Sequence, residues 1–220
     1  MFALLNRELT WVCIASFCCL LGCDNQQFPE IENRRICQSN LQALHRAINA
    51  YRNSHGGNYP QNIADKDGEP LLSWRVRLLP YLEQEELFRR FDLQKSWQSP
   101  PNKYLVSKLP AVFRCPNVRT DGTVTSYRAG WQVEGDQLLG DGSLECLESG
   151  NLTTIWTKPD VYNIEDFQSL GTVRASAHGR RFFGVSREGD AVVVDLHDPM
   201  KRKIHTVPQE VGSPKMAPKK

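Results

Sequence analysis

The chain has 220 residues, 40% of them hydrophobic, and its 27 Lys and Arg against 25 Asp and Glu give a formal net charge of +2. This length suits one domain with appendages, and the composition excludes a collagen, a coiled coil, a polytopic membrane protein and a globally disordered chain. A charge so close to neutral argues against a general electrostatic grip on nucleic acid, so we expect no nucleic-acid partner.

The N-terminus predicts an exported, lipid-anchored protein. Residues 9–21 form an apolar run that is short for a membrane span and typical of a signal peptide. The run ends in Leu-Leu-Gly-Cys at residues 20–23, which resembles a bacterial lipobox. We therefore expect removal of residues 1–22, acylation of Cys23 (with palmitate, for example) and a location on the cell membrane facing the periplasm, or on the outer membrane or surface. A secretory signal with a chance cysteine, or an uncleaved anchor, is the alternative.

Three parts follow the predicted signal peptide. Residues 23–33 are expected to be a lipidated tether, and residues 34–198 have the character of one folded domain. Residues 199–220 hold six Lys and Arg, four prolines and one acid, which predicts a basic disordered tail. The alternative role for this tail is contact with anionic lipid headgroups or a wall polymer.

The folded part begins with a predicted helix over residues 34–53. Its apolar side chains recur on one helical face, at Leu41, Leu44, Ile48 and Tyr51. The glycines at residues 56–57 supply the backbone freedom that a helix end requires. A stripe of this width predicts that the helix lies on a sheet.

The rest of the domain predicts short helices followed by strands. We expect short helices over residues 73–79, 83–91 and 99–108, with Ser73 as a helix cap. Strands are expected at residues 123–131, 152–157, 181–186 and 191–196, which are rich in β-branched and aromatic residues. The predicted fold class is α+β, with a long N-terminal helix packed on a small antiparallel sheet and short helices between.

Six motifs together resemble the planctomycete domain of unknown function 1559, over residues 36–196. They are Cys-Gln-Ser-Asn-Leu at 37–41, Ser-His-Gly-Gly-Asn-Tyr-Pro at 54–60, Leu-Ser-Trp-Arg-Val at 72–76, Trp-Gln-Ser-Pro-Pro-Asn-Lys at 97–103, Phe-Arg-Cys-Pro at 113–116 and Ile-Trp-Thr-Lys-Pro-Asp at 155–160. The resemblance implies a protein similar to the pseudopilins of the type II secretion G-protein kind, with a pilin-like helix and sheet.

The chain departs from that family in two places. Members commonly carry a His, nine residues and then Asp-Gly, whereas here His178 is followed by Glu188 and Gly189. A turn role could pass to the neighbouring residues, but a ligand role for this position would be in doubt. The polymerising apolar stem of the family is also replaced by the predicted lipid anchor, so we expect the protein not to assemble as an ordinary pilin.

The sequence contains no recognisable pattern of catalytic or metal-binding residues. The sequence lacks G-x-S-x-G, H-E-x-x-H and paired C-x-x-C motifs, so we expect no enzyme activity, cofactor or metal. The five histidines are expected at the surface or in turns: His45, His55, His178, His197 and His205. A calcium site is the alternative for a group of acids: Asp136, Asp141, Glu145 and Glu148.

Three cysteines other than Cys23 remain in the predicted mature chain: Cys37, Cys115 and Cys146. Export permits disulfides, and the preferred pair is Cys37 with Cys115, the alternative being three buried thiols. Four tryptophans are expected in the core, or alternatively on a glycan-binding platform: Trp74, Trp97, Trp131 and Trp156.

The predicted function is a non-enzymatic, membrane-anchored, pseudopilin-like lipoprotein with an interaction or structural role in the cell envelope. The protein partner expected for it is an envelope or secretion-system protein. The alternatives are a polysaccharide-binding module that uses tryptophans and the basic tail, and an accessory that docks on a secretion or pilus-like assembly.

Overall fold

The structure is a computed structural model that describes residues 27–118, 121–129, 144–148, 153–159, 178, 181–195 and 203–206. The chain divides into two compact units, Met1–Glu32 and Asn33–Lys220, and the second holds the sheets and the buried core described below. No helix in the described segments is both long enough and apolar enough to cross a membrane.

The first described element is the long helix α2, Gln27–Ser54. It begins well before residue 34, so the boundary predicted from the sequence is wrong and part of the expected tether is helical. Pro29 lies in the first turn, where its missing N–H breaks no helical hydrogen bond. The negative charge of Glu30 in the same turn interacts favourably with the positive end of the helix dipole. At the other end, the N–H of Gly57 donates to the Arg52 carbonyl at 2.8 Å, as predicted for a glycine-terminated helix.

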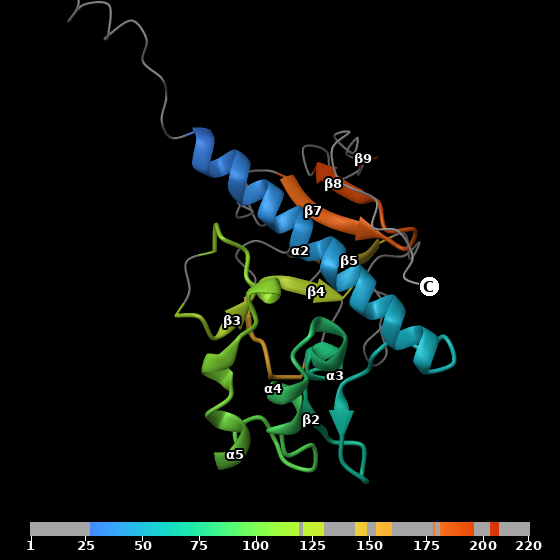
Figure 1. Ribbon diagram of the computed structural model, residues 1–220, viewed down its shortest axis with the longest axis vertical. Helices are drawn as coiled ribbons and strands as arrows, with labels where there is room; N and C mark the ends of the chain where they lie inside the picture. Colours follow the sequence, from blue (N-terminus) through green and yellow to red (C-terminus); the bar gives the residue numbers. More distant parts are fainter. Residues whose placement is uncertain are drawn as a thin grey trace, which may run out of the picture. The chain divides into compact units, whose positions relative to one another are not determined.

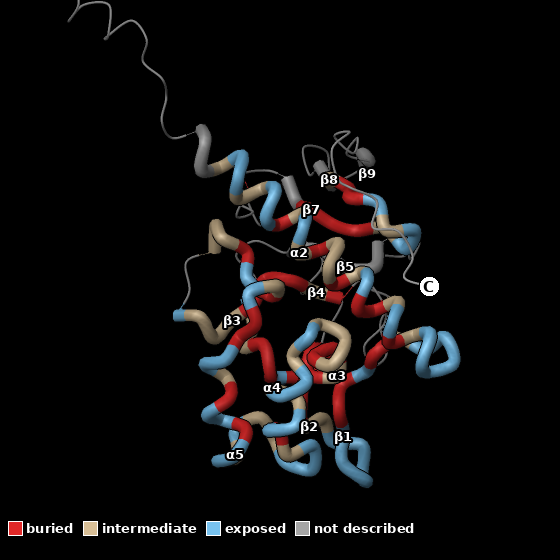
Figure 2. Tube along the Cα trace, in the orientation of Figure 1, coloured by how far each residue is buried: buried red, intermediate tan, exposed pale blue. Residues whose placement is uncertain are grey.

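One face of α2 is buried, which confirms the predicted apolar stripe. Leu41, Leu44 and Ile48 have at most 1% of their surface exposed, and Tyr51 is also buried. These side chains join a core that includes Tyr127, Phe183 and Val185 of the sheet described below. Figures 1 and 2 show α2 running across this sheet, with buried positions recurring along the helix.

Short elements fill the segment after α2. A two-stranded antiparallel pair is followed by short helices: β1 Ile63–Ala64, β2 Pro70–Leu72, α3 Trp74–Leu78, η1 Leu79–Leu82, α4 Glu85–Arg89, α5 Pro100–Lys103, η2 Val106–Lys108 and η3 Ala111–Phe113. The side chain of Ser73 accepts a hydrogen bond from the Arg75 N–H, so its predicted capping role is confirmed. The three predicted helical regions are present, but each is shorter or interrupted.

The remaining strands form two antiparallel sheets. In the smaller sheet β3, Val124–Thr125, pairs with β6, Thr154–Ile155. The larger sheet has the order β4-β5-β7-β8-β9, with bounds Tyr127–Ala129, Leu144–Glu148, Arg181–Ser186, Ala191–Asp195 and Lys203–Thr206. The fold is therefore α+β as predicted, and the expected hairpin is confirmed by pairs such as Phe183 with Val193.

Strand β9 corrects the prediction of a wholly disordered tail. Lys203–Thr206 pairs antiparallel with β8, for example Ile204 with Val194. Basic and proline-rich sequence on both sides obscured this short alternation of polar and apolar residues. Backbone pairing to the edge of β8 supplies the stabilisation that the composition of the tail does not suggest.

Candidate functional site

Two cysteines that are far apart in sequence meet beneath α2. Cys37 lies on the helix and Cys115 follows η3, and their Sγ atoms are 3.0 Å apart with a sequence separation of 78 residues. Both side chains are buried, at 0% and 1% exposed, and no disulfide bond joins them in this structure. The structure thus brings together the pair that the sequence prediction favoured, while the bond itself stays a prediction.

Tyr127 of β4 contacts the same sulfur pair from the sheet. Its phenol oxygen lies 3.0 Å from Cys37 Sγ. Asn40, one turn along α2 from Cys37, donates from Nδ2 to this phenol oxygen at 3.2 Å and to the Arg114 carbonyl at 2.9 Å. Because the phenol oxygen accepts from Asn40, its own proton can point toward Cys37 Sγ.

His178 completes the cluster. It lies in a turn, which is one of the two positions predicted from the sequence, but it is buried rather than at the surface. Only 3% of its surface is exposed. Its Nε2 lies 3.2 Å from Cys37 Sγ and 3.4 Å from Cys115 Sγ, and its ring meets Phe183 edge to face. No local sequence pattern could place it there, because the two sulfurs lie 141 and 63 residues away.

Two amides orient the His178 ring. Asn117 Nδ2 lies 2.9 Å from His178 Nδ1, and the Oδ1 of Asn117 accepts a hydrogen bond from Asn33 Nδ2. In this arrangement Nδ1 accepts, so the ring proton resides on Nε2, the nitrogen that faces both sulfurs. We call Cys37, Cys115, Tyr127 and His178 the sulfur cluster.

The sulfur cluster perturbs the acidity of its members. The hydrogen bond from Cys37 lowers the pKa of Cys115 to about 5, against the opposing effect of burial, and His178 contributes in the same direction. Burial raises the pKa of Tyr127 well above its usual value, and the neighbouring sulfur charges add to this effect. Hydrogen-bond donors therefore converge on the sulfurs, which favours a thiolate in the reduced protein.

The same atoms have the types and proximity of metal ligands. One ligand atom each from Cys37, Cys115 and His178 lies within 4.8 Å of the others, the one such group among the side chains that the structure describes. Zinc and copper bind thiolate sulfur and an imidazole lone pair. Here the ring nitrogen that faces the sulfurs carries the proton, so metal binding would require both amides to reverse.

The Glu-Gly part of the predicted family motif has a structural place in the turn between β7 and β8. Glu188 is exposed, and its N–H donates to Ser186 Oγ at 3.2 Å. Gly189 has φ of +92°, and a Cβ there would lie 2.7 Å from His45 Nε2 on α2. Glu188 thus has the turn role, while Gly189 lets the hairpin approach the helix closely.

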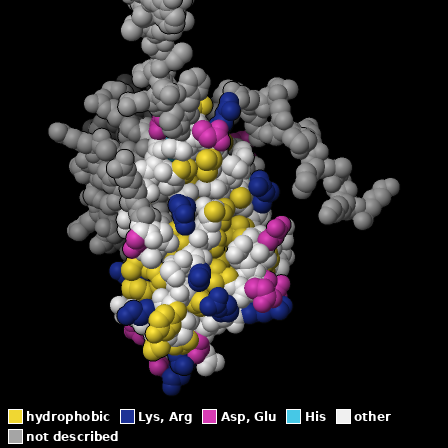
Figure 3. Space-filling model, turned by 60° about the vertical axis from the view of Figure 1, so that its left-hand side comes forward, with side chains coloured by type: hydrophobic (Ala, Val, Ile, Leu, Met, Phe, Trp, Pro, Cys, Tyr) yellow, Lys and Arg dark blue, Asp and Glu magenta, His cyan; other side chains and the backbone are white. Residues whose placement is uncertain are grey.

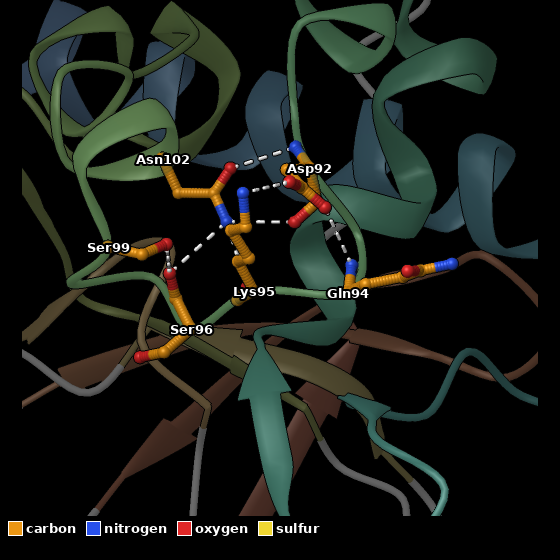
Figure 4. Close-up of polar contacts among 6 residues, drawn as sticks. All are labelled: Asp92, Gln94, Lys95, Ser96, Ser99 and Asn102. Carbon is orange, nitrogen blue, oxygen red and sulfur yellow. Dashed lines mark hydrogen bonds and ion pairs between the residues drawn. The ribbon is translucent and has the colours of Figure 1, made fainter.

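A second buried polar group organises the loop before α5 (Figure 4). Asn102 is fully buried, and its Oδ1 accepts from the Asp92 N–H at 2.9 Å. Its Nδ2 donates to the carbonyls of Asp92, Lys95 and Ser96 at 2.9, 2.8 and 3.2 Å. The hydrogen bond from Lys95 also holds the pKa of the Asp92 carboxyl below its usual range. This part of the Trp97–Lys103 motif is therefore structural.

The structure places some of the predicted tryptophans in the core, whereas the side chains of the predicted calcium ligands lie outside its description. Trp74 and Trp156 are fully buried and Trp97 is partly buried, which confirms the expected core role for the first two. Trp131, Asp136 and Asp141 lie outside the described residues, as do Cys23 and His197. Glu145 and Glu148 lie on β5, whose side chains are likewise outside the description, as are those of Cys146 and His205.

The described surface also has an open groove of about 350 Å³ beside α2, lined by Ala43 and Arg46 of the helix, Tyr81 to Gln84, and Pro110 to Val112. On the face in Figure 3, basic and acidic side chains are interspersed among hydrophobic ones, with no expanse of a single charge in its described part. This mixed surface is consistent with the near-neutral composition.

Comparison with known proteins places the chain in a family. No curated protein and no solved structure matches it. Residues 33–163 match the family described as "Protein of unknown function (DUF1559)", and this segment includes α2, Cys37, Cys115 and Tyr127. Because the match covers more than half of the chain, the protein belongs to the DUF1559 family.

Proposed function

We propose that the protein is a non-enzymatic lipoprotein of the cell envelope, anchored through acylated Cys23, whose globular unit has an interaction or structural role. In this proposal the globular unit is pseudopilin-like and faces the periplasm. It does not polymerise as an ordinary pilin, because acyl chains hold it in the membrane but cannot form the core of a filament.

The observation that carries this proposal is the order of the lipobox-like sequence and α2. Residues 20–23 read Leu-Leu-Gly-Cys, and α2 begins at Gln27. Four of the first ten residues of α2 are charged, Glu30, Glu32, Arg34 and Arg35, and its buried stripe starts only at Cys37. Acyl chains on Cys23 would supply the membrane affinity that this helix lacks, since several chains on one residue give stable anchoring.

The enclosure of the sulfur cluster supports a structural rather than a catalytic role. Cys37, Cys115 and His178 are each at most 3% exposed, so a substrate could not reach the sulfurs without opening the fold. Their contacts join α2, the η3 loop and residue 178. Such contacts stabilise the globular unit against unfolding.

The alternative of polysaccharide binding loses part of the support that the sequence offered for it. A stacking platform needs exposed aromatic faces, whereas Trp74 and Trp156 are fully buried. Part of the basic tail is also strand β9, whose backbone is paired with β8.

Acyl labelling with membrane fractionation tests the proposal. Wild-type protein and a Cys23→Ala variant would be produced in a bacterial host with a clickable palmitate analogue, and Cys19→Ala would serve as the matched control because residue 19 is removed with the signal peptide. We expect label and membrane association in the wild type and in Cys19→Ala, and neither in Cys23→Ala. Unlabelled wild-type protein that retains residues 1–22, or recovery of the protein as an integral filament subunit, would contradict the proposal.

A further inference from the structure

Cys37 marks the position where α2 becomes part of the core. From Glu30 to Ile36 the side chains of α2 are exposed or half-buried, with Ile31 48% and Ile36 39% exposed. Cys37 is fully buried, and the buried stripe continues through Leu41 and Leu44. A link at Cys37 would therefore hold the helix at the start of its buried part, where fraying of the exposed first turns would otherwise reach the core.

Cys115 is held close to Cys37 by contacts on both sides of it. The Arg114 carbonyl accepts from Asn40 of α2, and the Cys115 carbonyl accepts from the Val118 N–H at 3.1 Å. Cys115 is 1% exposed and its Sγ lies 3.0 Å from that of Cys37. The fold thus keeps the two sulfurs together without a bond, which gives them a high effective concentration for forming one.

The hydrogen-bond directions favour a sulfur–sulfur bond over a metal. Asn33 donates to Asn117, Asn117 donates to His178 Nδ1, and His178 directs an N–H at both sulfurs. A donor accommodates a thiolate or a disulfide sulfur, whereas a metal needs the lone pair of the same nitrogen.

We propose that Cys37 and Cys115 form a disulfide bond in the mature protein, a covalent clasp that fixes α2 at the residue where the helix enters the core. Formation of this bond in cells rests on the export included in the proposed function, because exported compartments are oxidising. Its formation in the purified protein depends only on the geometry described above.

The reaction is an exchange with a disulfide-bearing oxidant, either a thiol oxidase of the exported compartment or oxidised glutathione. The Cys115 thiolate attacks one oxidant sulfur, breaking the oxidant's disulfide and giving a mixed disulfide. The Cys37 thiolate then attacks Cys115 Sγ and releases the second oxidant sulfur. The protein loses two protons and two electrons, which reduce the oxidase disulfide to a dithiol or oxidised glutathione to two glutathione thiols. Because both sulfurs are buried, the exchange takes place before α2 packs fully or during its local opening.

Thiol counting tests the bond. The chain from residue 23 onward, with Cys23→Ala so that only Cys37, Cys115 and Cys146 remain, would be purified, equilibrated in a glutathione redox buffer, denatured and alkylated. We expect one alkylated thiol without reductant and three with it, and a non-reduced peptide that joins residues 37 and 115. Cys146→Ala is the matched control. In this variant we expect no alkylated thiol without reductant and two alkylated thiols with reductant.

Hydrogen exchange tests the clasp. We expect backbone amides of α2 near Cys37 to exchange at least about tenfold more slowly in the oxidised than in the reduced protein, with little change in the last turn near Ser54. Reduction of the unmutated pair makes this comparison independent of whether a cysteine variant folds. Equal exchange in both states would refute the clasp even if the bond forms.

The remaining outcomes separate the alternatives. Three alkylated thiols after oxidation, or a bond that involves Cys146, would overturn the proposal. So would stoichiometric zinc or copper in protein purified without chelator, if it is lost in His178→Ala, since the disulfide does not need this ring. A disulfide that forms in the purified chain, together with an unacylated protein that stays in the cytoplasm, would contradict the proposed function and support the clasp.

Discussion

The loop around Asn102 and the sulfur cluster are both buried polar groups, but they connect the chain over very different distances. Asn102 binds partners at most 10 residues away. The sulfur cluster joins residues separated by 63 to 141 positions. The first therefore organises one loop whose ends are already close, while the second forms only when α2, η3 and residue 178 have come together. Long-range links stabilise by restricting a larger part of the unfolded chain, so disrupting the sulfur cluster should have the larger effect.

The largest expected effect is loss of the proposed clasp. The bond would close a loop with a sequence separation of 78 residues, for which chain entropy gives about 4 kcal/mol of stabilisation. We expect reductant, or the double variant Cys37→Ala with Cys115→Ala, to lower the melting temperature by roughly 10 °C. Calorimetry of the oxidised wild type with and without reductant measures this, and the double variant should not respond to reductant. If the melting temperature of the wild type also does not respond to reductant, the sulfur cluster would not have the larger effect on stability that its long-range contacts predict.

The next largest expected effect is the pH dependence of the stability of the reduced protein. The folded pKa of Cys115 is lowered to about 5 from 9.0, so between these values the unfolded protein binds more protons than the folded one. The stability of the reduced wild type should therefore rise with pH, by no more than about 1.4 kcal/mol per pH unit, and the contribution should be lost as the pH falls through about 5.

Denaturant unfolding of the reduced protein between about pH 6 and about pH 8 measures this slope. The oxidised protein and the reduced Cys115→Ala variant are the controls, since neither has this thiol to titrate. Parallel pH curves for all three would show that the cluster does not stabilise a thiolate.

Disrupting the loop around Asn102 should cause a smaller loss of stability than disrupting the sulfur cluster. Asn102→Ala removes one acceptor and the donor to three carbonyls in a fully buried position, and we expect a cost of about 2–3 kcal/mol. The matched control is Gln94→Ala in the same loop, because the Gln94 side chain is exposed and only its backbone N–H binds Asp92. The loss should be the same in oxidised and reduced protein; a redox-dependent loss would mean that the two regions are coupled.

Features set by local pattern were predicted from the sequence, and most features set by distant contacts were not. The helical spacing of Leu41, Leu44 and Ile48 gave the buried face of α2, and Ser73 was correctly identified as a cap. The pairing of β7 with β8 follows from two β-rich runs that flank a turn. In each case the determining residues lie within a few positions of one another.

The candidate site shows where this kind of prediction ends. Cys37 and Cys115 could be paired from a small number of cysteines, but His178 and Tyr127 could not be added, because their places depend on how the sheet and α2 pack. Strand β9 was missed for a related reason, since Lys203–Thr206 becomes a strand through pairing with β8 rather than through its own composition. Strand β5 was not predicted either, although its backbone pairs with both β4 and β7.

The smallest expected effect comes from the turn that touches α2. Gly189 has a positive φ and lies against His45, so Gly189→Ala combines backbone strain with a steric contact. Gly68 has nearly the same φ, +89°, with nothing within 4 Å of an added Cβ, so Gly68→Ala isolates the backbone part. We expect Gly68→Ala to lower the free energy of unfolding by about 1 kcal/mol, and Gly189→Ala to lower it by about 1 kcal/mol more. Denaturant unfolding measures both values.

A double variant separates the two contributions at Gly189. Removing the ring in His45→Ala should abolish the steric part, so that adding Gly189→Ala to that background costs the same as Gly68→Ala. Because His45 lies on the same helix as Cys37, the excess cost should also be larger in the oxidised protein, where the clasp keeps α2 from moving away from the turn. An excess that is the same in both redox states would show that α2 is held against the β7–β8 turn by its apolar face alone, and that the long-range link adds nothing at this end of the helix.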